Sequence, residues 1–95
     1  EQSAHSTKVR SYLNIATNVK VNNNREITTE RNKVITLNGE GFNDVISIYI
    51  GNVKCGILDK TDNVIRFVIN DNVVSDDLLL LTDIGYIYVS RVNIT

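Results

Sequence analysis

Hydrophobic and polar residues alternate along much of the chain from residue 12 onward. Apolar side chains occupy the odd positions Leu13, Ile15, Val19 and Val21, with a break expected near residues 17–18. A period of two places every second side chain on the same side of a β-strand. No segment has the i, i+3, i+4, i+7 pattern over three turns that an amphipathic helix requires. The pattern therefore predicts an all-β protein.

Polar and glycine-containing turns divide this region into about seven predicted strands. Residues 22–26 are interpreted as a turn, and Gly51-Asn52 is typical of a β-hairpin. The four leucines at 78–81 are interpreted as a strand, because the run is short and a turn containing Gly85 follows it. Turn spacings near 8–12 residues favour a β-sandwich. The expected strands are 12–21, 33–38, 45–50, 53–58, 64–69, 78–82 and 86–94.

The first eleven residues differ from the rest of the chain. Residues 1–11, EQSAHSTKVRS, are mostly polar and have neither a helical nor a strand period. They are predicted to form a polar N-terminal arm that precedes a sandwich domain at residues 12–95. Ordering such an arm costs about 1–2 kcal/mol per residue, which it cannot recover in an isolated monomer. We therefore expect residues 1–11 to lie against another subunit in an assembly.

Composition and charge restrict the partners. Hydrophobic residues make up 42% of the chain, without Met or Trp, and Val, Ile and Leu dominate among them, as is typical of strands. Ten basic and eleven acidic residues leave a net charge of −1, so no nucleic acid partner is expected. No apolar run approaches the roughly 18–20 residues that span a bilayer, so no membrane partner is expected either.

The sequence offers little for catalysis. His5 is the only histidine, and it lies in the predicted arm, so a triad would lack a fixed base. Cys55 is the only cysteine, which excludes a disulfide within the chain. Its apolar neighbours Val53 and Ile57 predict a buried, unreactive thiol. We predict that the protein is not an enzyme, with no catalytic residues and no cofactor.

Several aspartates invite a calcium hypothesis. The segment 59–63 has oxygen ligands at alternate positions, but Val64 stands where an EF-hand loop needs glycine, and no bidentate Glu follows. Solvated turns explain these residues better, and no metal site is predicted. The aspartates considered are Asp59, Asp62, Asp71, Asp76, Asp77 and Asp83.

Four tyrosines are candidates for an aromatic binding surface. They are Tyr12, Tyr49, Tyr86 and Tyr88. Tyrosine gives a large contact area at a low cost in conformational entropy. Tyrosines also commonly bridge the core and the solvent. Partner contact and a structural use are equally compatible with the sequence.

One segment resembles the IPT/TIG family of immunoglobulin-like domains. The sequence VITLNGEGF at 34–42, followed by Ile48 to Gly51, is similar to the family's apolar strand, glycine-phenylalanine corner and strand ending in a glycine turn. Cys55 matches a cysteine common after that turn, and 78–94 is similar to the family's final strands. Phe67 stands where disulfide-bearing members have a second cysteine, which argues against an animal receptor. The resemblance implies an immunoglobulin-like β-sandwich.

Family members occur in receptors, transcription factors, bacterial surface proteins and phage virions, so the resemblance leaves the role open. Our first hypothesis is a non-catalytic structural or decoration component of a virion capsid, tail or fibre, in contact with other virion subunits. The alternative is a binding module of a cell-surface adhesin or receptor that recognises a protein or a glycan through its loops. The corresponding locations are the virion and the cell surface.

Overall fold

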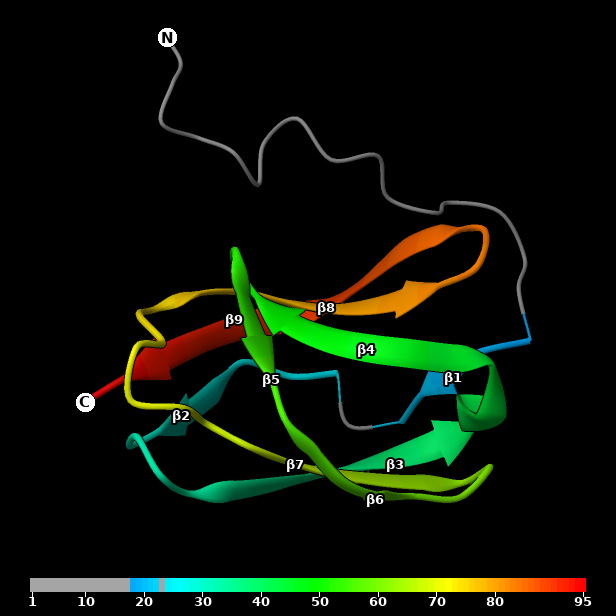
Figure 1. Ribbon diagram of the computed structural model, residues 1–95, viewed down its shortest axis with the longest axis horizontal. Helices are drawn as coiled ribbons and strands as arrows, with labels where there is room; N and C mark the ends of the chain where they lie inside the picture. Colours follow the sequence, from blue (N-terminus) through cyan, green and yellow to red (C-terminus); the bar gives the residue numbers. More distant parts are fainter. Residues whose placement is uncertain (1–17, 23) are drawn as a thin grey trace, which may run out of the picture.

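The computed structural model describes residues 18–22 and 24–95, which form nine strands in two packed sheets (Figure 1). The predicted all-β, immunoglobulin-like sandwich is confirmed. The 3₁₀ turn η2 (Phe42–Asp44) joins the two layers. The strands are β1 (Lys20–Val21), β2 (Ile27–Thr29), β3 (Val34–Glu40), β4 (Val45–Ile50), β5 (Val53–Cys55), β6 (Ile57–Lys60), β7 (Val64–Val68), β8 (Asp76–Thr82) and β9 (Gly85–Ile94).

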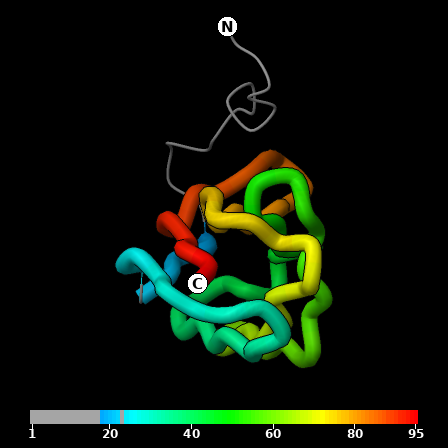
Figure 2. Tube along the Cα trace, turned by 90° about the vertical axis from the view of Figure 1, so that its left-hand side faces the viewer, coloured from blue at the N-terminus to red at the C-terminus, as the bar shows by residue number. Residues whose placement is uncertain are grey.

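The two sheets have the strand orders β1-β3-β7-β6 and β2-β9-β8-β4-β5. Neighbouring strands are antiparallel except for β2 and β9, which run parallel with Ile27 opposite Val92. Figure 2 shows β2, in cyan, beside the red C-terminal strand. Long-range pairing of this kind joins the beginning of the described domain to its end.

Nine strands replace the expected seven for two reasons. The short strand β2 was not predicted, because Ile27 to Thr29 is too brief to show a period. The expected strand 53–58 is divided at Gly56: β5 pairs with β4 in one sheet, and β6 pairs with β7 in the other. Of the expected strand 12–21, the described part contains only β1. Residues 12–17 and the predicted arm at 1–11 lie outside the described residues.

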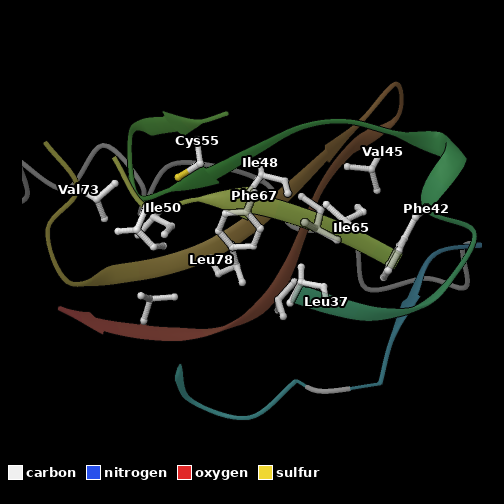
Figure 3. Close-up of a cluster of buried hydrophobic side chains, with 14 of the residues drawn as sticks. Leu37, Phe42, Val45, Ile48, Ile50, Cys55, Ile65, Phe67, Val73 and Leu78 are labelled. Atoms are coloured by element: carbon white, nitrogen blue, oxygen red, sulfur yellow. The ribbon is translucent and has the colours of Figure 1, made fainter. Parts of the chain in front are cut away.

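The core lies between the sheets and follows the predicted alternation (Figure 3). Leu37 of β3 and the β7 residues Ile65 and Phe67 are fully buried, while Thr36 and Arg66 between them point outward. β-Branched and aromatic side chains on one side of each sheet thus supply the main hydrophobic stabilisation. The buried core residues are Val19, Leu37, Phe42, Val45, Ile48, Ile50, Cys55, Ile65, Phe67, Ile69, Val73, Leu78, Leu80, Val89 and Val92.

Two glycines form a tight corner where β3 leaves its sheet. A Cβ atom on Gly39 would lie 1.9 Å from the carbonyl oxygen of Lys20, and one on Gly41 would lie 2.0 Å from that of Asn18. Gly41 also has a φ of 75°, which glycine adopts at low cost. Strand β3 therefore ends at Glu40, two residues beyond the end of the expected strand 33–38. Phe42 then enters the core, where it is fully buried.

The variant Gly39→Ala should be destabilised by at least about 2–3 kcal/mol, because its methyl group overlaps the Lys20 backbone. The matched control is Gly56→Ala, since no atom lies within 4 Å of a Cβ placed there. We expect this control to change stability by less than about 1 kcal/mol. Urea unfolding of both variants measures the difference. Equal losses would contradict a specific close approach at Gly39.

Removal of a buried hydroxyl should stabilise the sandwich. Ser90 is 3% exposed, and among the described side chains its Oγ is a buried polar atom without a hydrogen-bond partner. Burying such a group costs about 1–3 kcal/mol. We expect Ser90→Ala to raise the midpoint of urea unfolding. The comparison variant is Ser47→Ala on β4, whose midpoint is measured in the same way. A lower midpoint for Ser90→Ala would show that the hydroxyl has a stabilising partner.

Candidate interaction surface

The outward side of the five-stranded sheet is unusually apolar. Leu78 and Leu80 of β8 point into the core, so Leu79 and Leu81 lie on the opposite side of the strand. Leu79 is nevertheless 0% exposed, although it does not belong to the core cluster. Side chains on the outward side of the sheet must therefore cover it.

Strand register identifies these side chains. Across β4, β8 and β9, one row places Tyr49 opposite Leu79 and Leu79 opposite Tyr88. The next row places Ser47, Leu81 and Tyr86 side by side. Directly opposed residues of antiparallel strands share a face, with Cβ atoms about 4.5–5.5 Å apart. We call the six residues of these two rows the tyrosine face.

Aromatic packing links the two rows diagonally. The rings of Tyr49 and Tyr86 meet edge to face, with centroids 6.1 Å apart and an interplanar angle of 74°. This arrangement is favourable for aromatic pairs. Tyr88 remains 47% exposed, whereas Ser47 is 6% exposed. The tyrosine face is therefore a preformed apolar surface with tyrosine rings at its outer layer.

Charged and apolar residues border the tyrosine face on different sides. Lys54 of β5 is paired with Tyr49, and the pair Asp77 and Arg91 follows one row beyond Leu79. At the opposite end, Ile46 and Ile84 are 58% and 63% exposed. The surface thus combines an apolar centre with a partly charged border, as protein interfaces do.

The outward side of the four-stranded sheet has a different character. Thr36 is paired there with Arg66, whose Nε donates to the Asp59 carboxylate at 2.9 and 3.1 Å. The hydrogen bond from Arg66 holds the pKa of Asp59 below its ordinary value. Both side chains are about half exposed, so this ion pair adds little stability. Val34, at 49% exposure, is an exposed apolar residue on this polar side.

Cys55 is buried, as predicted, at 1% exposure. Burial raises the pKa of its thiol to about 11, although backbone hydrogen bonds at Asn70 and Ile50 act in the opposite direction. A thiol with this pKa is almost entirely protonated near neutral pH, and the thiolate is the nucleophilic form. The environment of Cys55 therefore opposes nucleophilic chemistry.

The other candidates from the sequence are scattered. Asp59 is held by Arg66, and Asp62 accepts a long 3.4 Å hydrogen bond from the backbone of Asn43. Within residues 18–22 and 24–95, no group of three or more His, Cys, Asp and Glu residues could hold a metal ion. The same part of the chain has no helix long and apolar enough to cross a bilayer. His5 and Tyr12 lie outside the described residues.

Three of the four candidate tyrosines do meet on one surface. Tyr49, Tyr86 and Tyr88 were singled out in the sequence, but their grouping depends on which strands are neighbours. Leu79, Leu81 and Ser47 were missed as members of the surface. A signal was present, because the apolar run 78–81 has leucines of both parities and so supplies both sides of its strand.

The sheet orders, the interlayer core and the glycine corner define an immunoglobulin-like sandwich module. A model of the IPT/TIG domain family matches residues 24–82, and the chain therefore belongs to the IPT/TIG family. These domains are a non-catalytic, immunoglobulin-like class. The matched region contains the glycine corner and extends through β8, but not β9. No curated protein matches the chain.

The raised pKa of Cys55 predicts a stability loss in alkali. The folded state holds the thiol proton up to about pH 11, whereas an exposed thiol loses it near 9.0. The unfolded state therefore gains relative stability as the pH rises from about 9 to 11. We expect the wild type to lose stability over this range relative to Cys55→Ala, measured by urea unfolding. Parallel curves for the two proteins would contradict the assignment.

Proposed function

We propose that this IPT/TIG domain is a non-catalytic binding module that contacts a protein partner through the tyrosine face. The observation that carries the proposal is the asymmetry between the two outward surfaces. One has two adjoining rows of tyrosine and leucine, and the other has the Asp59–Arg66 ion pair between its edge strand β6 and the neighbouring strand β7. Sandwich folds host many functions, so the argument depends on this surface and not on the fold.

The composition of the tyrosine face favours a protein over a glycan. Tyrosine is enriched at protein interfaces, where its ring is buried and its hydroxyl finds a partner. Leu81 is the middle residue of the second row, between Ser47 and Tyr86, and Ser47 is nearly inaccessible to solvent. Apart from the tyrosine hydroxyls, the face therefore presents few polar groups for the hydroxyls of a sugar. Lys54, Asp77 and Arg91 at the border would orient a protein partner.

A catalytic role has no comparable support. The Cys55 thiol is buried with a raised pKa. The Asp59 carboxylate is engaged by Arg66 on the opposite sheet. Neither group adjoins the tyrosine face.

The virion and cell-surface hypotheses are two settings for the same type of contact. The virion hypothesis depended on the arm at residues 1–11, which lies outside the described residues, so it stays a prediction. The adhesin hypothesis placed binding in the loops, whereas the present proposal places it on a sheet face. Both keep the domain as a module that holds another macromolecule.

The test compares two exposed apolar residues on opposite sheets. Tyr88→Asp places a carboxylate on the tyrosine face, and Val34→Asp does the same on the four-stranded sheet at a similar exposure of 49% against 47%. The immobilised domains are exposed to proteins from the native source, and retained proteins are identified by mass spectrometry. We expect Tyr88→Asp to reduce retention of a specific protein at least about tenfold, as loss of an interface anchor does.

The matched variant determines the interpretation. Val34→Asp should retain the same protein as the wild type. Equal loss in both variants, or no loss in Tyr88→Asp, would place the binding site elsewhere. Binding of the wild type to a glycan array that Tyr88→Asp abolishes would favour the glycan alternative instead.

A further inference from the structure

We propose that Asn38-Gly39 is a site of spontaneous covalent modification that the folded glycine corner keeps inactive. When the corner opens, the Gly39 nitrogen attacks the Asn38 side chain, and an isoaspartyl product forms that prevents the corner from closing again. Three features support this inference: the sequence of the dipeptide, the hydrogen bonds that hold its peptide group, and the lack of space beside Gly39.

The chemistry needs only the chain and water. The backbone nitrogen of Gly39 bonds to Cγ of Asn38 and gives up its proton, while the side-chain nitrogen gains a proton and leaves as ammonia. The product is a five-membered succinimide ring. Water then opens either C–N bond of this ring and yields an aspartyl residue or an isoaspartyl residue, in which the main chain runs through Cβ and Cγ. Neither step requires an oxidant, a reductant or a cofactor.

Asn38 has the least hindered neighbour for this reaction. Among the asparagines of the chain, it alone precedes a glycine. Glycine has no Cβ atom beside the attacking nitrogen, and its backbone rotates freely when nothing holds it. Asn52, Asn63 and Asn72 each precede valine, whose branched side chain crowds its own nitrogen. Asn38 is also exposed to solvent, so water reaches the site.

In the folded domain, hydrogen bonds hold the peptide group between these two residues on both sides. The Asn38 carbonyl accepts a 2.7 Å bond from the backbone N–H of Asn22. The Gly39 N–H donates to the Asn63 carbonyl at 2.9 Å. In an extended strand such as β3, ψ is about +135°, which leaves the Gly39 nitrogen rotated well away from the ring position. Ring closure requires rotation about ψ, and this rotation breaks both hydrogen bonds.

The isoaspartyl product does not fit the corner, because it lengthens the main chain by one methylene group. Gly39 is paired with Val21 of β1, and residue 38 is paired with Val64 of β7, so the added atom disturbs the register on both sides of β3. The space beside Gly39 is already filled, since a Cβ atom there would lie 1.9 Å from the Lys20 carbonyl oxygen. An opening that lasts long enough for the reaction therefore becomes irreversible.

Incubation of the full chain in mildly alkaline buffer, with and without urea, tests whether folding controls the reaction. Peptide mapping by mass spectrometry locates each amide that becomes a carboxylate, and an isoaspartyl methyltransferase assay counts isoaspartate. We expect Asn38 to react at least about tenfold faster in urea, because the folded chain must first open. Asn38→Gln is the chemical control: its longer side chain would have to close a six-membered ring, so position 38 should stay unmodified over the same period.

Two matched variants test the hydrogen bonds at the corner. Asn63→Ala removes the 3.0 Å bond from the Asn63 amide to the Gly39 carbonyl, and Asn70→Ala removes a 2.7 Å bond of the same kind to Lys54. In the folded protein, Asn63→Ala should speed the modification of Asn38 at least about threefold, as loss of one stabilising hydrogen bond allows. Asn70→Ala should keep the rate near that of the wild type. Any other ranking of the two variants, or equal wild-type rates with and without urea, would overturn the proposal.

A refolding experiment separates the effect of the backbone from that of the charge. Wild-type protein modified in urea is diluted into buffer, folded and unfolded molecules are separated on a native gel, and isoaspartate is measured in each fraction. We expect isoaspartate in the unfolded fraction, whereas Asn38→Asp, which has the carboxylate without the added methylene, should refold. Isoaspartyl molecules that refold would overturn the proposal, and so would failure of Asn38→Asp to fold. No partner is needed, so failure here leaves the proposed binding function to its own test.

Discussion

The close approach of the Asn18–Lys20 backbone to Gly39 and Gly41 organises one end of the sandwich. Neither glycine position has room for a Cβ atom, because carbonyl oxygens of the first described segment occupy that space. The Phe42 ring also lies against Gly39. The backbone of Gly39 is paired with Asn63 through a 2.9 Å hydrogen bond, and the Asn63 amide returns one of 3.0 Å. The corner therefore connects β1, β3, η2 and the turn between β6 and β7.

This constraint explains which parts of the fold could be predicted from the sequence. Alternation in 33–38 and 64–69 determines which side chains face the core, because one face of each strand must leave water. In 45–50 a register shift between Val45 and Ser47 changes the parity, so that Val45, Ile48 and Ile50 all face the core. The glycine corner was recognised from its residues. Its reason, a neighbouring backbone twenty residues earlier in the chain, is a tertiary contact that no local pattern contains.

The parts that were missed depend on long-range pairing. Ile27 to Thr29 becomes a strand because β9 lies beside it, not because three residues favour one. Residues 53–58 read as one strand, since Val53, Cys55 and Ile57 all face the core. The core is shared by both sheets, so the same parity is kept while the chain changes sheets at Gly56. The tyrosine face could not be predicted from the sequence either, because its rows depend on how β4, β8 and β9 are paired.

The parallel pairing of β2 and β9 has a mechanical consequence. If the domain is stretched from its two ends, β2 is drawn toward its beginning and β9 toward its end. Because the strands point in the same direction, the two pulls slide them past each other and load the hydrogen bonds from Ile27 to Thr29 together. An antiparallel hairpin pulled open at its free ends would instead break its bonds one at a time. A pair of strands arranged in this way therefore resists tension along the line through its ends better than a hairpin of the same length.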